Sequence, residues 1–128
     1  MVGALALTLF SATWAGPVTT PKEFFGFDVC EDYQMFNYTR LTGYWSQLAK
    51  ESKRIRLVNL GKTEEGRDQW MAVVSDPSNL ANLERHRRAA QELASAKAWT
   101  TEEEAFRQIE NMKAMVWIDG GIHSTETL

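Results

Sequence analysis

The amino-acid sequence predicts an α/β fold that is incomplete at its C-terminus. The expected order of elements is helix, hairpin, two helices and central strand, which suits the first part of a mixed α/β sheet. Five apolar residues in a row, Ala114–Ile118, predict a strand that is covered on both faces. Such a strand needs neighbouring strands and covering helices, and the 128 residues supply too few of either. We therefore expect the protein to continue beyond Leu128.

The N-terminal residues 1–15 predict a signal peptide. Met1–Trp14 is apolar and carries no charged side chain, and Thr13 and Ala15 are small enough for the −3 and −1 positions of a signal-peptidase site. The run is too short to span a bilayer, and a buried helix is the alternative. We expect a secreted or periplasmic protein without stable membrane association.

Residues 16–36 contain two prolines and two glycines without a helical period, so they predict an extended N-terminal segment. Three aromatic residues are expected to anchor it: Phe24, Phe25 and Phe27. Apolar residues then recur at helical spacing, which predicts a helix over about Tyr38–Glu51 with Asn37 as its N-cap.

Two β-rich runs, Ile55–Leu60 and Gln69–Ser75, predict a hairpin because a polar, glycine-bearing connection separates them. Asp76-Pro77-Ser78 ends the second strand and begins a helix. Its expected inward positions are Leu80, Leu83, Ala90 and Leu93. Thr101–Glu104 matches the capping box, in which Thr and Glu satisfy each other's backbone amides, and begins a third helix. Its expected inward positions are Ala105, Phe106, Ile109 and Met112.

The charge balance argues against nucleic acid as a partner. Fourteen Lys and Arg residues against seventeen Asp and Glu residues give a net charge of −3, whereas phosphate binding needs a basic patch. The short basic stretch Arg85–Arg88 predicts a solvated helix face, with His86 facing solvent. Cys30 is the single cysteine, so these residues cannot form a disulfide or a cysteine zinc cluster.

A histidine and a carboxylate, His123 and Glu126, follow the predicted central strand. Sites in open α/β sheets form at the carboxyl ends of strands, and Gly120 and Gly121 permit an irregular backbone there. An imidazole and a carboxylate suit a Lewis-acidic, catalytic zinc. Alternatively, Glu126 lies in the first turn of a helix, and spacing and position favour neither interpretation. Catalytic zinc sites use three protein ligands, and the sequence supplies two.

Several segments in register resemble the M14 zinc carboxypeptidase family. "GGIHSTE", Gly120–Glu126, is similar to that family's first zinc-ligand segment, and "LGKTEEGRDQWMAVVS", Leu60–Ser75, is similar to its upstream hairpin. Further similarity covers nearly all of Thr20–Leu128, as in a mainly bacterial-type branch. The resemblance implies the N-terminal part of a mixed-sheet zinc-carboxypeptidase-like fold, with residues 37–128 as the first, truncated part of the peptidase domain.

The resemblance implies that His123 and Glu126 bind Zn²⁺ and that the substrate is a peptide or protein C-terminus, hydrolysed by water at the C-terminal amide. The family's third zinc histidine, its carboxylate-binding arginine and its general-base glutamate have no counterpart up to Leu128. No catalytic residue is therefore expected here, and the 128 residues alone should be inactive. Gly66 and Arg67 match the hairpin motif and are expected to be a turn glycine and a hydrogen-bonding arginine.

Two other functions stay open. Digestive members of the family carry an arginine one residue before the ligand glutamate, where this chain has Thr125. That departure leaves room for a related zinc amidohydrolase that cleaves a different amide. A catalytically silent, secreted α/β binding module is the other alternative, and it would allow a genuine end at Leu128.

Overall fold

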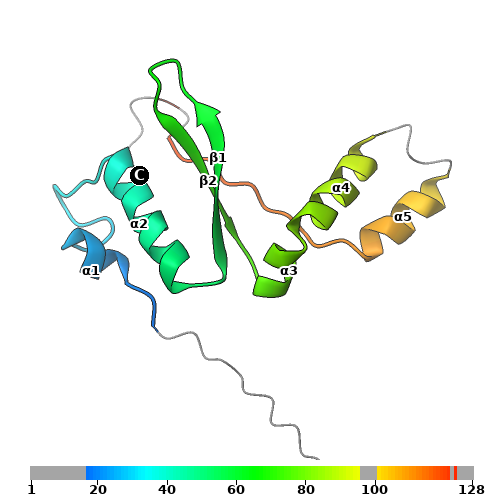
Figure 1. The fold of residues 1–128 in the computed structure, drawn as a ribbon, viewed down its shortest axis with the longest axis horizontal. Coiled ribbons are helices and arrows are strands. Elements are labelled where there is room, and N and C mark those ends of the chain that lie inside the picture. The colour runs from blue at the N-terminus through cyan, green and yellow to red at the C-terminus, as the bar shows by residue number, and fades with distance from the viewer. Residues whose placement is uncertain (1–16, 96–100, 122, 124–128) are drawn as a thin grey trace, which may run out of the picture.

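The computed structural model describes residues 17–95, 101–121 and 123 of the chain. Over those residues it is a mixed arrangement of helices and one two-stranded antiparallel sheet. The elements are α1 (Pro21–Phe25), α2 (Tyr38–Glu51), β1 (Ile55–Lys62), β2 (Asp68–Val74), α3 (Pro77–Ala81), α4 (Leu83–Ala94) and α5 (Glu102–Glu110). The β1–β2 hairpin lies between α1 and α2 on one side and α4 and α5 on the other (Figure 1). The predicted signal peptide lies outside the described residues.

Helix α2 forms where the helical spacing predicts it. The Asn37 side chain accepts a hydrogen bond from the Arg40 amide at 3.0 Å, which confirms Asn37 as the N-cap. The apolar residues of the helix form one half-buried stripe: Leu41, Tyr44, Trp45 and Leu48. This stripe faces the N-terminal segment and β1, so α2 joins the two.

An aromatic cluster packs the N-terminal segment against α2. Phe25 is 6% exposed and stacks on Phe36, with ring centroids 4.2 Å apart and 9° between the planes. Phe24 meets Phe25 edge to face, and Tyr44 from α2 lies 5.3 Å from Phe25. Such geometries are favourable for aromatic pairs. The prediction that these phenylalanines anchor the segment is confirmed, with Phe24 and Phe27 half-buried.

The short helix α1 interrupts the segment that was predicted to be extended, so that prediction is wrong over Pro21–Phe25. Thr20 and Glu23 form a capping box, and Pro21 occupies the first turn, where its missing amide costs nothing. Gly26 ends the helix in the left-handed region at φ 85°. Five residues are too few to show a helical period in the sequence, which is why the spacing gave no signal.

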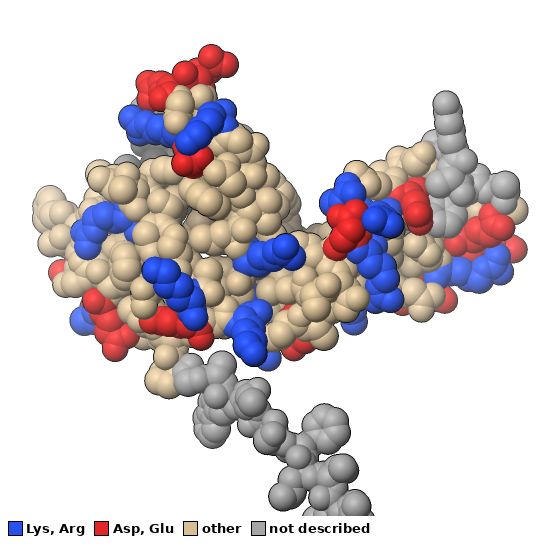
Figure 2. Space-filling view, viewed as in Figure 1, with Lys and Arg blue, Asp and Glu red and all other residues tan. Residues whose placement is uncertain are grey.

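The hairpin prediction is confirmed. Ile55 pairs with Val74 and Asn59 with Trp70, and a bulge follows between Asn59 and Gly61. Figure 2 shows acidic and basic side chains gathered at the hairpin tip and along α4, while other residues cover most of the face between them.

The second predicted helix is two helices in the structure. The backbone of Asn82, at φ −106° and ψ 21°, leaves the helical region and separates α3 from α4. The Asn82 side chain donates to the Ser78 carbonyl at 2.8 Å, so it competes with the backbone for a helical carbonyl. Leu80 is buried at 7% exposure, as expected of an inward position.

The capping box at Thr101 is confirmed, since the Thr101 side chain accepts from the Glu104 amide. The inward placement of Phe106 and Ile109 is wrong, because these side chains are 58% and 46% exposed. Helix α5 packs mainly against α4, so its apolar side has no sheet to cover it within the described residues.

The predicted central strand, Ala114–Ile118, is also wrong for this structure. The segment follows α5 as irregular chain, with Val116 84% and Ile118 86% exposed. A strand needs a hydrogen-bonding neighbour, and in the described part of the chain β1 and β2 pair only with each other. No helix among the described residues is long and apolar enough to span a membrane.

Exchanging Phe25 for alanine should lower the free energy of unfolding by about 3 kcal/mol, because it empties the centre of the aromatic cluster. The matched control, Phe106→Ala, removes the same atoms from an exposed site and should cost less than about 1 kcal/mol. Urea denaturation followed by circular dichroism measures both. Equal losses for the two variants would show that the aromatic cluster is not the core.

Candidate metal centre

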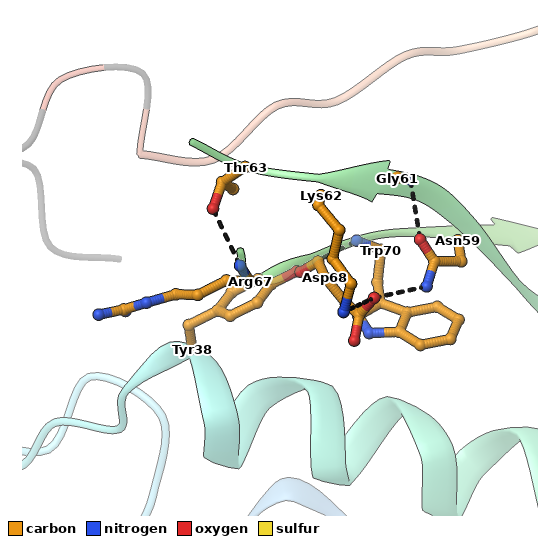
Figure 3. Close-up of polar contacts among 8 residues, drawn as sticks. All are labelled: Tyr38, Asn59, Gly61, Lys62, Thr63, Arg67, Asp68 and Trp70. Atoms are coloured by element: carbon orange, nitrogen blue, oxygen red, sulfur yellow. Dashed lines mark hydrogen bonds and ion pairs between the residues drawn. The ribbon is translucent and has the colours of Figure 1, made fainter. Parts of the chain in front are cut away.

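The hairpin that precedes the predicted ligand segment carries a polar network near its tip (Figure 3). The Asp68 carboxylate accepts from the side-chain amide nitrogen Nδ2 of Asn59 at 2.8 Å and pairs with the Lys62 ammonium at 2.7 Å. The Lys62 contact, followed by that of Asn59, holds the pKa of the Asp68 carboxyl below its ordinary value. The side-chain oxygen Oδ1 of Asn59 accepts from the Gly61 backbone amide at 2.8 Å, so one asparagine stabilises both the bulge and the strand pair.

The turn at the hairpin tip explains the Gly-Arg pair. Gly66 has φ 77°, a left-handed backbone that favours glycine, and its amide donates to the Thr63 carbonyl at 2.8 Å. The Arg67 amide donates to the Thr63 hydroxyl at 3.1 Å, and the Arg67 carbonyl accepts from the Thr63 amide. The turn role of Gly66 is confirmed. Arg67 stabilises the turn through its backbone amide and carbonyl, while its exposed guanidinium forms an ion pair with Glu65 at 3.3 Å.

The Tyr38 hydroxyl fastens this hairpin to the first turn of α2. It donates to the Asp68 carbonyl at 2.9 Å and accepts from the Trp70 amide at 3.1 Å. Both groups lie on the edge of β2 that faces away from β1, where backbone groups would otherwise lack a partner in the sheet. These contacts could not be predicted from the sequence, because no local pattern relates Tyr38 to positions thirty residues away.

The segment after α5 leads to the predicted ligands. The Trp117 indole donates to the Asp119 carboxylate at 2.6 Å, and Gly121 turns the backbone at φ 68°. His123 lies in an exposed bend, and Glu126 falls outside the described residues. The structure therefore describes the position of His123 only, and the distance between the two predicted ligands is not tested. The hydrogen bond between Trp117 and Asp119 was not predicted from the sequence. The only sequence pattern that indicates it is a side-chain donor two residues before a side-chain acceptor.

The donor chemistry of the ligand segment fits zinc, which takes imidazole nitrogen and carboxylate oxygen. Over residues 17–95, 101–121 and 123, no three His, Cys, Asp or Glu side chains gather into a group that could hold a metal ion. The structure thus supplies one imidazole in an accessible bend, and a complete ligand set would need Glu126 and a further donor.

His86 does not face solvent as predicted. The residue is half-buried on α4, and its Nε2 atom is enclosed without a hydrogen-bond partner in the described part of the chain. It lines a hollow of about 210 Å³ with residues of α5 such as Gln108. The arginines beside it are exposed, as expected, and Glu84 accepts hydrogen bonds from Arg87 and Arg88, which lower the pKa of its carboxyl to about 2.

Comparison with protein families shows which family the chain belongs to. The model of the family described as zinc carboxypeptidase, Peptidase_M14, matches residues 41–128, more than half of the chain. The chain belongs to the M14 zinc carboxypeptidase family. The match begins within α2 and includes the hairpin, α4, α5 and the segment with His123 and Glu126. Comparisons with curated proteins and with solved structures gave no significant match.

Removing the Tyr38 hydroxyl, by Tyr38→Phe, should lower the free energy of unfolding by about 0.5–1.5 kcal/mol, because two hydrogen bonds to β2 are lost. The control Tyr33→Phe removes the hydroxyl of a fully exposed tyrosine and should leave stability unchanged. Chemical denaturation of both variants provides the comparison. If Tyr38→Phe behaved like Tyr33→Phe, the hydroxyl would not hold the hairpin to α2.

Proposed function

We propose that the protein that includes this chain is a zinc-dependent metallocarboxypeptidase, which hydrolyses the C-terminal peptide bond of peptides or proteins. The family match over residues 41–128 carries the proposal, because the matched range contains the His-x-x-Glu segment. The apolar residues 1–15 support a secreted or periplasmic location, where such a peptidase would meet peptide substrates.

In this proposal His123 and Glu126 hold the zinc ion. His123 offers an imidazole nitrogen from an exposed bend, and Glu126 offers carboxylate oxygens three residues later. Gly121, at φ 68°, provides the backbone turn that precedes the histidine. When bound, zinc supplies Lewis acidity toward the substrate carbonyl and toward water.

The remaining chemistry needs groups that the resemblance does not find among these 128 residues. A general base must take a proton from the attacking water and return it to the leaving amine, and a cation must grip the terminal carboxylate of the substrate. We therefore expect the 128 residues alone to lack hydrolytic activity.

A zinc titration tests the ligand assignment. Replacing His123 by alanine should weaken zinc binding at least about tenfold, since even the loss of an outer-shell partner costs that much. His86→Ala, which removes the other histidine of the chain, should bind zinc as the parent does. The measurement is competition with a chelating dye at neutral pH. An equal loss in both variants, or no loss in either, would contradict the assignment.

Cleavage of matched peptides tests the reaction. The protein that includes this chain should remove single residues from a peptide with a free C-terminal carboxylate, as followed by mass spectrometry, and 1,10-phenanthroline should stop it. The same peptide with an amidated C-terminus should resist cleavage, because the carboxylate that positions the bond is gone. Chelator-sensitive cleavage by the 128 residues alone would show that the missing groups are not needed.

Thr125 favours one second candidate, a zinc amidohydrolase with a different substrate. The residue before the ligand glutamate is arginine in digestive members of the family, and a threonine there removes a cation from the neighbourhood of the substrate. Acylated amino acids and branched peptides, assayed beside ordinary peptides, distinguish the two activities. Zinc binding without any hydrolysis would instead support a catalytically silent binding module.

A further inference from the structure

The N-terminal strap, residues 17–20, is held on α2 through one residue. The Thr19 amide donates to Oε2 of Glu51 at 2.8 Å, and the Thr19 hydroxyl donates to Oε1 at 2.6 Å. The Tyr44 hydroxyl donates to the Thr19 carbonyl at 2.9 Å. Every backbone and side-chain polar group of Thr19 is therefore bonded to α2, across thirty-two residues of sequence in the case of Glu51.

Glu51 is suited to this role because both of its oxygens are surrounded by donors. Besides the two bonds from Thr19, Oε1 accepts from the Gln47 side-chain amide at 2.6 Å. Glu51 and Thr19 are both half-buried, so water competes less for these bonds than it would on an open surface. An ionised carboxylate is an acceptor only, whereas a protonated carboxyl carries one O–H donor, has less acceptor capacity and has lost the negative charge that strengthens its hydrogen bonds.

We infer that Glu51 is an acid-sensitive catch that fastens the N-terminal strap to α2 and releases it when the carboxylate is protonated. A proton on Oε2 would face the Thr19 amide, which cannot accept it, and a proton on Oε1 would face the Gln47 amide as well as the Thr19 hydroxyl. In either position the carboxyl loses the negative charge to which these donors are bonded, so the bonds that hold the strap become weaker.

The titration window follows from the same contacts. Hydrogen bonds from Thr19, and then from Gln47, hold the pKa of the Glu51 carboxyl below its ordinary value of 4.5. A carboxyl with a lowered pKa in the folded protein stabilises the fold fully above its unfolded pKa, and this contribution is lost as the pH falls through the folded pKa. The catch is therefore closed at neutral pH and opens only in acid, below 4.5.

Two other titratable groups face Glu51 from the packed elements. Glu23 of α1 is negative and repels it, while hydrogen bonds with Thr20 lower the pKa of the Glu23 carboxyl itself. The Tyr44 hydroxyl stays neutral in acid, because burial and the two carboxylates raise its pKa. An experiment must therefore distinguish protonation of Glu23 from protonation of Glu51, since the pKa of each carboxyl is lowered.

Amide hydrogen exchange at Thr19, followed by NMR between about pH 7 and pH 3 and corrected for intrinsic rates, tests the catch. We expect protection at neutral pH that falls at least about fivefold in acid, the equivalent of one net hydrogen bond. Amides of the β1–β2 hairpin, such as Met71, should keep their protection over the same range. In Glu51→Gln, Thr19 should be poorly protected at neutral pH and show no acid step.

The control Glu23→Gln removes the second carboxyl and should retain the acid step at Thr19. An acid step that persists in Glu51→Gln, or that disappears in Glu23→Gln, would overturn the inference. Parallel loss of protection at Thr19 and Met71 would also overturn it, because the acid step would then report unfolding of the whole protein.

Discussion

The two hydrogen bonds of the Tyr38 hydroxyl are the constraint on which the position of the β1–β2 hairpin beside α2 depends. They join the first turn of α2 to the outer edge of β2, where the Asp68 carbonyl and the Trp70 amide lack a partner strand. A phenolic hydroxyl can both donate and accept, so one side chain satisfies both groups. The hairpin is thereby held beside α2, and α2 in turn carries the aromatic cluster at Tyr44 and the strap at Glu51.

Most of the fold that the sequence predicts correctly is decided by residues that lie close together in the chain, as in the helix caps, the turn at the hairpin tip and the hairpin itself. The N-caps at Asn37 and Thr101 depend on a side chain and an amide three residues apart, and the turn at Gly66 depends on one backbone angle. Ala114–Ile118 and Phe106 were predicted from apolar character alone. An apolar side chain is stabilised by burial, but another element of the fold must pack against it. Within the described residues no such element packs against these positions.

The candidate site shows the same division. Donor types and spacing make His123 and Glu126 candidate ligands but leave a helix start at Glu126 equally open, and it is the resemblance to the family that implies zinc binding by the two residues. The family match confirms the relationship that those residues suggest, whereas the relative position of the two ligands lies outside the described residues. His86 illustrates the limit of local reasoning: its charged neighbours predicted exposure, and packing between α4 and α5 encloses its Nε2 atom instead.

X-ray absorption spectroscopy at the zinc edge, on the zinc-loaded protein, tests the central claim most directly. A member of this family that uses His123 and Glu126 should give a first shell of nitrogen and oxygen at about 2.0–2.2 Å, with the outer-shell scattering of imidazole. A sulfur shell at about 2.3 Å would place zinc on a thiolate such as Cys30 and contradict the assignment. A shell of oxygen alone, without imidazole, would contradict the part assigned to His123.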